Sequence, residues 1–269
     1  MKHILVGIDG SEESKAALHY AVALAAALSA NLELAHAATP TPPAPEALPR
    51  MPEAMRVADF LLGTTARENR VGGMLPSTRL LSGEPGAALA HAARQSRASL
   101  VVVGTHGAGR AVRLLFGSTS DYLLQHCETP VLVVRKEWPP PHPGGRILLA
   151  ADGSFESRLA ASEAIMLCSA TGSALRVAFL ESAPPARRAH EEAVLRELAI
   201  RESHAAVELE IVVVPGHPAE ALAEVAREPG TSLIVLGQRG RGPVERLLAG
   251  TTSSRLVQLA NVPVLVVRA

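Results

Sequence analysis

The feature that most constrains the fold is a repeat that covers nearly the whole chain. The segment ILVGIDGSEESKAALHYAVALAAALSANLELAHA begins at Ile4, and ILLAADGSFESRLAASEAIMLCSATGSALRVAFL begins at Ile147. Each contains an apolar run, the triplet Asp-Gly-Ser, a stretch rich in Ala and Leu, and a second apolar run. The ends of the halves also match, as STSDYLLQHCETPVLVVR and TTSSRLVQLANVPVLVVR. Because such self-similarity indicates a duplicated structural unit, we expect two domains of the same fold.

The junction between the halves lies in the segment KEWPPPHPGGR, residues 136–146. Its prolines and glycines cannot continue a helix or a strand. We therefore predict a first domain over residues 1–137, a linker over 138–145 and a second domain over 146–269. The first half is about ten residues longer than the second, and we place the excess in the Pro-rich segment 39–53. A surface loop is the simpler interpretation of that segment, and a lid over a ligand is the alternative.

Short apolar runs rich in Val and Ile alternate with stretches of helical length in both halves. Such runs are typical of strands buried on both faces, and the alternation predicts a parallel sheet flanked by helices. The predicted fold class is therefore α/β, with a five-stranded parallel sheet in each half. The predicted strands are 3–8, 32–37, 78–81, 100–104 and 131–135, then 147–151, 175–180, 208–214, 233–237 and 262–267.

Composition excludes several classes of protein. The 26 basic and 26 acidic side chains balance, which argues against a large surface for duplex nucleic acid. Cys127 and Cys168 form no CxxC pair, so we expect no metal site and two buried thiols in a reducing compartment. The amino-terminal segment turns polar too early for a signal peptide, and the longest apolar stretch is an Ala-rich helix with a histidine. We therefore expect a cytoplasmic protein with no membrane or nucleic-acid partner.

A spacing of glycines occurs once in each half, as G-x2-G-x9-G followed by a hydroxyl residue. The two sets are Gly104, Gly107, Gly117 and Ser118, and Gly237, Gly240, Gly250 and Thr251. Glycines let the backbone approach a ligand without a Cβ in the way, and a helix start offers N–H groups to an anion. The pattern predicts a phosphate cradle, although glycine turns and Ser or Thr caps also occur in α/β proteins that bind nothing there. Neither copy has the Lys of a Walker loop.

Asp9 and Asp152 each follow the first strand of their half, and Gly104 and Gly237 end the fourth. In a doubly wound sheet these strands are neighbours, and ligands bind at their carboxyl ends. Each Asp could accept a hydrogen bond from an adenine amino group or a ribose hydroxyl. The glycine spacing and the Asp-Gly-Ser triplet therefore converge on one predicted crevice in each half.

These motifs resemble the universal stress protein family in its tandem two-domain form, over nearly the whole chain apart from the Pro-rich segment and the linker. The resemblance implies two Rossmann-like domains of the adenine nucleotide alpha hydrolase-like type. In that family the final strands pair across a two-fold axis, so an internal pseudo-dimer is expected here, with a further homodimer left open. Members with an intact glycine motif bind ATP, which makes ATP, with or without Mg²⁺, the expected cofactor.

The resemblance also assigns the nucleotide-binding residues. In the first half they are Ile8, Asp9, Ala37, Val103, Gly104, His106, Gly107, Gly117, Ser118 and Thr119. In the second half they are Ala151, Asp152, Phe179, Leu236, Gly237, Arg239, Gly240, Gly250, Thr251 and Thr252. Phe179 is taken as the counterpart of Ala37, and Arg239 as that of His106, so the two sites need not bind equally.

Three functions remain open at this point. The first is an ATP-binding universal stress protein that acts as a nucleotide-dependent stress-response or signalling module, whose protein partner is unknown. The second is a slow ATPase, for which His106 is the one obvious base, so at most weak hydrolysis is expected and no catalytic residue is assigned. The third is a scaffold for partner proteins whose glycines serve only as turns.

Overall fold

The structure, a computed structural model, describes residues 2–38, 53–105, 117–138, 144–202, 207–238 and 251–268. The Pro-rich segment up to residue 52, the centre of the predicted linker and the interiors of both glycine motifs lie outside these ranges. The described chain forms two compact units. Unit 1 comprises Met1–Thr129 with Val134–Lys136, and unit 2 comprises Pro130–Val133 with Glu137–Ala269.

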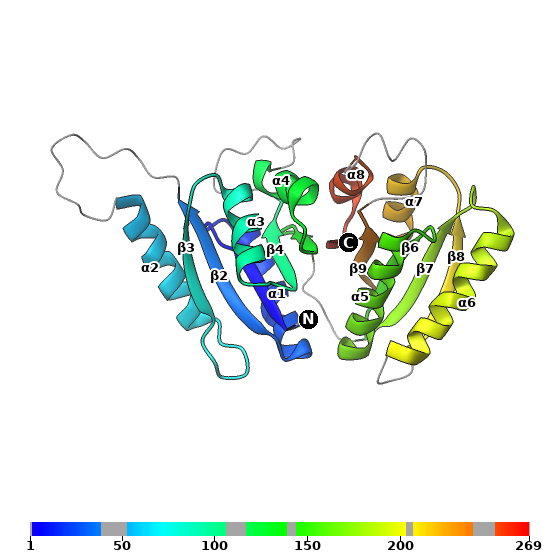
Figure 1. Cartoon of the computed structure of the whole chain (residues 1–269), viewed down its shortest axis with the longest axis horizontal. Helices are drawn as coiled ribbons and strands as arrows, with labels where there is room; N and C mark the ends of the chain where they lie inside the picture. Colours follow the sequence, from blue (N-terminus) through cyan, green and yellow to red (C-terminus); the bar gives the residue numbers. More distant parts are fainter. Residues whose placement is uncertain are drawn as a thin grey trace. The chain divides into compact units, whose positions relative to one another are not determined.

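Strands and helices alternate along the first half, as the sequence predicted (Figure 1). They are β1 (His3–Gly7), α1 (Glu12–Leu28), β2 (Asn31–Ala38), α2 (Glu53–Glu68), β3 (Ser77–Ser82), α3 (Pro85–Gln95), β4 (Leu100–Gly104), α4 (Ser118–His126) and β5 (Val131–Val134). The second half repeats the order with β6 (Arg146–Ala151), α5 (Phe155–Thr171), β7 (Ala174–Leu180), α6 (Pro185–Glu202), β8 (Leu209–Val214), α7 (Pro218–Val225), β9 (Thr231–Gly237), α8 (Thr251–Leu259) and β10 (Val264–Val267).

Each unit contains a parallel sheet in which the first strand of the half lies between the second and the fourth. In unit 1, β1 pairs with β2 and β4, and β2 pairs with β3. In unit 2, β6 pairs with β7 and β9, β8 pairs with β7, and β10 pairs with β9. The α/β fold class and the neighbouring position of the first and fourth strands are therefore confirmed.

The last strand of the first half pairs with the last strand of the second half. Val131–Val133 of β5 belong to unit 2, where they pair antiparallel with Val264–Val266 of β10. Both segments read VLVV and are fully buried. An apolar edge strand gains backbone hydrogen bonds and burial by pairing with another strand, which accounts for this addition to the sheet of unit 2.

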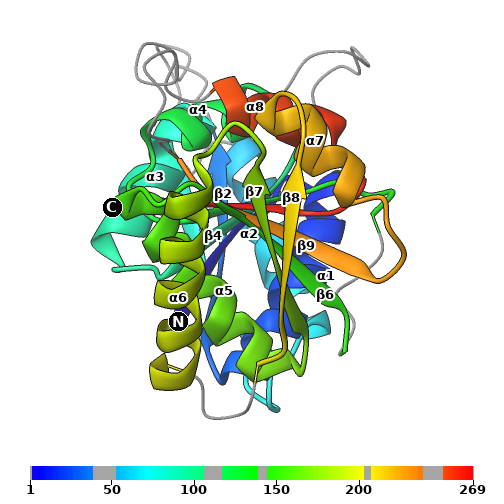
Figure 2. The ribbon, with the colours of Figure 1, turned by 90° about the vertical axis from the view of Figure 1, so that its right-hand side faces the viewer.

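Helices cover both faces of each sheet. In unit 1, α1 packs on β1 and β4, α2 on β2 and β3, and α3 on β2, β3 and α4. In unit 2, α5 and α6 lie on one side of β7 and β8, and α7 lies on the other (Figure 2). Small residues allow close packing of α1, whose buried face includes Ala17, Ala21 and Ala25. This covering explains why the central strands are apolar on both sides.

Three further findings bear on the cysteines, on membrane spans and on metal sites. Cys127 and Cys168 are free thiols and both are buried, as predicted; burial raises the pKa of Cys168 to about 12. None of the helices within the described ranges has the length and apolar character that a membrane span requires. The same ranges hold no cluster of three or more His, Cys, Asp or Glu side chains suited to a metal ion.

Candidate functional site

The Asp-Gly-Ser triplet of the first half forms a compact turn between β1 and α1. Asp9 Oδ1 accepts hydrogen bonds from the Ser11 backbone N–H at 3.0 Å and from the Ser11 hydroxyl at 2.6 Å. Gly10 has φ +82°, a conformation that L side chains rarely adopt. Ser11 Oγ in turn accepts from the Ser14 N–H at 3.1 Å and so caps α1.

The triplet of the second half forms the same turn before α5. Asp152 Oδ1 accepts from the Ser154 N–H at 2.9 Å, and Gly153 has φ +73°. Ser154 Oγ accepts from the Ser157 N–H at 3.0 Å and caps the helix. Each residue of the triplet therefore has a local structural role, and one carboxylate oxygen of each Asp serves the turn itself.

Gly104 and Gly237, at the ends of β4 and β9, have a packing reason for being glycine beside the predicted approach of a ligand. A Cβ on Gly104 would lie 2.7 Å from Glu13 Cβ and 2.8 Å from the Glu13 carbonyl carbon. A Cβ on Gly237 would lie 2.7 Å from the Glu156 carbonyl carbon. Both distances are too short for real atoms, so the missing side chain makes room for the first turn of α1 or α5. Helix packing, without any ligand, accounts for this glycine in both halves.

The start of α4 is tied to the end of β4. The Gly117 N–H donates to Thr105 O at 2.9 Å, and the Ser120 hydroxyl lies 3.1 Å from the same oxygen. The amide of Gly117 is therefore used within the protein, which corrects the expectation that it faces a phosphate. The next two amides, of Ser118 and Thr119, have no hydrogen-bond partner in the described part of the chain, and no side chain caps the helix.

His36 is a polar residue at the site that the sequence analysis missed. Its Nδ1 lies 2.6 Å from Ile8 O, directly before Asp9, and carries the hydrogen because a carbonyl oxygen only accepts. The ring is half-buried beside the end of β1. Asp9 and His36 are separated by the same number of residues as Asp152 and Phe179. Comparing these two spacings would have identified His36 as the counterpart of Phe179.

The strand register also corrects one predicted equivalence between the halves. Gly7 of β1 pairs with Ala35, and Ala150 of β6 pairs with Ala178. The counterpart of Phe179 is therefore His36, and the counterpart of Ala37 is Leu180. A shift of one residue along a strand moves a side chain to the other face of the sheet, so the corrected pair compares side chains on the same face.

The structure brings part of the predicted site together in the first half. Asp9 and Gly104 follow neighbouring parallel strands, and the Thr105 carbonyl links Gly117–Thr119 to the end of β4. The described members of the first half are Ile8, Asp9, Ala37, Val103, Gly104, Gly117, Ser118 and Thr119. Those of the second half are Ala151, Asp152, Phe179, Leu236, Gly237, Thr251 and Thr252. His106, Gly107, Arg239, Gly240 and Gly250 lie outside the described residues.

An ion pair stands next to the turn of the second half. Arg158 of α5 donates to Glu191 of α6 from Nη2 at 2.7 Å and from Nε at 3.3 Å. These hydrogen bonds raise the pKa of Arg158 above its usual range. The Glu191 side chain is 5% exposed, whereas that of Arg158 is 43% exposed. A buried carboxylate with a cationic partner therefore flanks the Asp152–Ser154 turn.

Comparisons with known proteins agree with this architecture. The sequence matches the Universal stress protein family over residues 1–135 and again over 145–268. A universal stress protein of Mycolicibacterium smegmatis is 32% identical over 293 residues, which span 98% of this chain and 96% of the relative. One from Mycobacterium tuberculosis is 31% identical over 289 residues, with the same coverage of 98% and 96%.

A solved structure has the same fold over its full length. The universal stress protein from Archaeoglobus fulgidus DSM 4304 superposes with a TM-score of 0.77 at 21% identity, covering 99% of this chain and 98% of that one. The two family matches, the full-length relatives and the shared fold confirm the resemblance seen in the sequence. The chain therefore belongs to the universal stress protein family and carries two of its domains in tandem.

Proposed function

We propose that the chain binds ATP and acts as a nucleotide-dependent stress-response or signalling module. The adenine and ribose are held at the carboxyl ends of β1 and β2, beside Asp9 and His36. The phosphates lie at the start of α4, against the amides and hydroxyls of Ser118 and Thr119. The observation that carries the proposal is the start of α4, which no side chain caps within the described residues. This helix follows β4, the neighbour of the strand that precedes Asp9.

The start of α4 differs from the start of α1 in a way that favours an anion. Ser11 caps α1 with its own hydroxyl, so that helix start is satisfied internally. Gly117 precedes α4 without a side chain, and its φ of −64° is open to any residue. Backbone conformation therefore does not require glycine at this position. A helix start that offers free N–H groups and a partial positive charge suits a phosphate.

The proposal can be tested by isothermal titration of the full chain with ATP, in the presence and absence of Mg²⁺. We expect saturable binding that Gly117→Val abolishes in the first half, because a branched side chain would occupy the space in front of the Ser118 and Thr119 amides. Gly63→Ala is the matched control, since a Cβ at Gly63 meets only the Arg67 guanidinium at 3.7 Å. Control and wild type should bind alike.

The titration also separates the alternatives. The absence of any ATP binding by the wild-type chain would refute the proposal and favour a scaffold for protein partners. Phosphate release measured at saturating ATP tests the slow ATPase, and we expect it to stay at background. Steady turnover above background would show an enzyme instead of a binding module.

A further inference from the structure

The two Asp-Gly-Ser turns have the same hydrogen bonds but different surroundings. Gly10 is exposed and Ser11 is half-buried, whereas Gly153 and Ser154 are both buried. Around Gly10 the nearest atoms to a Cβ would be the Leu61 methyl groups of α2, at 3.7 and 3.9 Å. The turn of the first half is therefore open to solvent on the side where the turn of the second half is covered.

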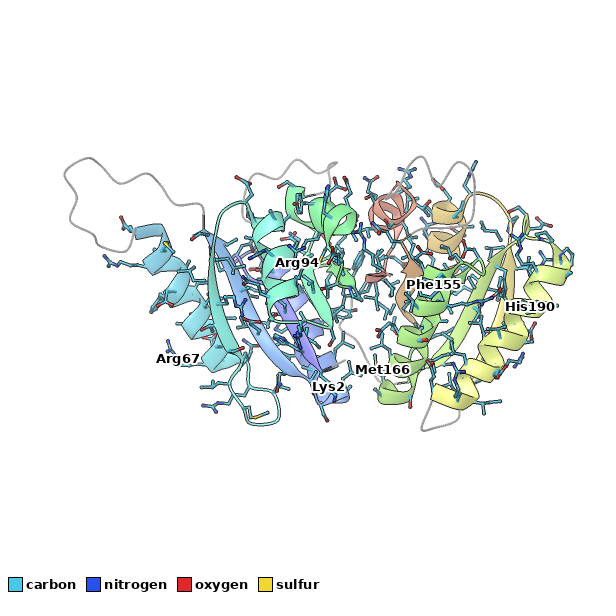
Figure 3. The ribbon with its side chains drawn as sticks, in the orientation of Figure 1. Lys2, Arg67, Arg94, Phe155, Met166 and His190 are labelled. Carbon is cyan, nitrogen blue, oxygen red and sulfur yellow. The ribbon has the colours of Figure 1, made fainter. Side chains whose placement is uncertain are left out.

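The cover over the second turn is the carboxylate of Glu191. A Cβ on Gly153 would lie 2.6 Å from Glu191 Oε1, so this carboxylate sits directly on the turn. Glu191 belongs to α6, where Figure 3 marks the adjacent residue His190. The ion pair with Arg158 of α5 holds the carboxylate in place. In the first half, α2 presents the apolar Leu61 to the equivalent glycine instead.

A second difference lies in the side wall at the end of the second strand. His36 is half-buried, and its polar ring contacts the Ile8 carbonyl at 2.6 Å. The residue in the same register, Phe179, is 1% exposed, so its phenyl ring is packed on all sides. Where the first half keeps a polar ring that solvent can reach, the second half has a filled apolar core.

We propose that the first half alone binds the nucleotide, so that each chain takes up one ATP, and that Glu191 closes the second half. This inference rests on the proposed function. Asp152 is half-buried like Asp9, so the closure comes from the groups around it. A base entering beside Asp152 would have to displace Glu191 from its cation, and a carboxylate moved within a buried site without its partner is strongly disfavoured.

The test is the number of ATP molecules bound per chain, measured by equilibrium dialysis with labelled ATP on the full-length protein. We expect one for the wild type and none for Gly117→Val. Two ATP per wild-type chain would overturn the inference. The inference would also be overturned if the wild type bound one ATP and Gly117→Val still bound it. No ATP in the wild type or in any variant would instead refute the proposed function, on which the inference depends.

The role of Glu191 is tested by Glu191→Ala, for which we expect an increase from one to two ATP per chain. Arg158 is partly exposed and can be hydrated when its partner is removed, so the variant should fold, as circular dichroism will show. Glu192→Ala is the matched control, because Glu192 is the next residue of α6 and pairs with Arg196 at the surface. It should keep one ATP. A folded Glu191→Ala chain that still binds one would overturn the assignment of Glu191.

A variant that failed to fold would not leave the inference without a test. Photo-crosslinking of an azido-ATP analogue to the wild type, followed by peptide mapping, locates the bound nucleotide directly. We expect labelled peptides from residues 1–135. Labelling that falls equally on the second half would overturn the inference.

Discussion

The two halves differ most instructively at the amino ends of their strands, opposite the candidate site. In unit 1 the buried charge is Glu33 of β2, which lies 3.0 Å from His3 Nε2 and 2.7 Å from Arg79 Nε. In unit 2 the buried charge is Arg176 of β7. It donates two hydrogen bonds of 2.9 Å to Glu210 and pairs with Glu228.

These two buried charges occupy the same place in the fold with opposite sign. Glu33 pairs in register with Leu5 of β1, and Arg176 pairs with Leu148 of β6. Oppositely charged side chains of neighbouring segments surround each of them: Arg79 of β3 lies beside Glu33, whereas Glu210 and Glu228 lie beside Arg176. The comparison shows that a charge buried at this end of the sheet is compensated, whichever its sign.

The carboxyl ends of the strands show the opposite behaviour. The Asp-Gly-Ser turn is the same in both halves, because the carboxylate, the positive φ and the serine hydroxyl each satisfy a fixed need of the backbone. These residues satisfy backbone hydrogen bonds and a backbone conformation. A change of charge on a neighbouring segment therefore could not compensate for their loss. The three experiments below probe this contrast, from the largest expected effect to the smallest.

Reversing one buried charge without its partners should have the largest effect. Glu33→Arg places a cation against Arg79, and Arg176→Glu places an anion against Glu210 and Glu228. We expect each to lower the free energy of unfolding of its unit by about 3–5 kcal/mol, measured by urea denaturation. Lys15→Glu is the surface control; both members of its pair with Glu12 are well exposed, and it should cost less than about 1 kcal/mol. Equal costs for buried and surface reversals would refute the comparison.

Adding a methyl group at the ends of β4 and β9 should have an intermediate effect. Gly104→Ala and Gly237→Ala force the first turn of α1 or α5 away from the sheet, and we expect a loss of about 1–3 kcal/mol in denaturant unfolding. Gly63→Ala, in the middle of α2, should instead stabilise the chain by about 0.5–1 kcal/mol. If Gly104→Ala left stability unchanged and removed ATP binding, ligand approach and not helix packing would explain this glycine.

Acid should produce the smallest effect, which the Arg176–Glu210 pair of unit 2 can test. Hydrogen bonds from Arg176 hold the pKa of Glu210 below its usual range. As the pH falls through about 4, the unfolded chain therefore takes up a proton before the folded chain does, and the stability contributed by this pair is lost. The effect is small because Glu210 is 48% exposed. In thermal melts between pH 7 and 3, Glu210→Gln should lose less than the wild type. Melting curves of the two that shift in parallel would contradict this.

Much of the fold could be predicted from local patterns. The apolar runs located each described strand to within about two residues, because buried parallel strands need continuous apolar side chains. The two triplets correctly marked the ends of β1 and β6. The register error at Phe179 and the missed packing role of Gly104 share one cause. Both depend on which atoms of a distant segment lie nearby, and spacing along the chain carries no such information.

The sequence by itself determined the tandem α/β architecture, the family and the two Asp-Gly-Ser turns, because periodicity and turn chemistry act between residues close in the chain. Only the tertiary structure decided that Gly104 serves the packing of α1, that Phe179 stands in the register position of His36, and that Glu191 covers Gly153. Helix packing and strand pairing join residues tens of positions apart. Their outcome depends on the shape of the assembled chain, which no local pattern records.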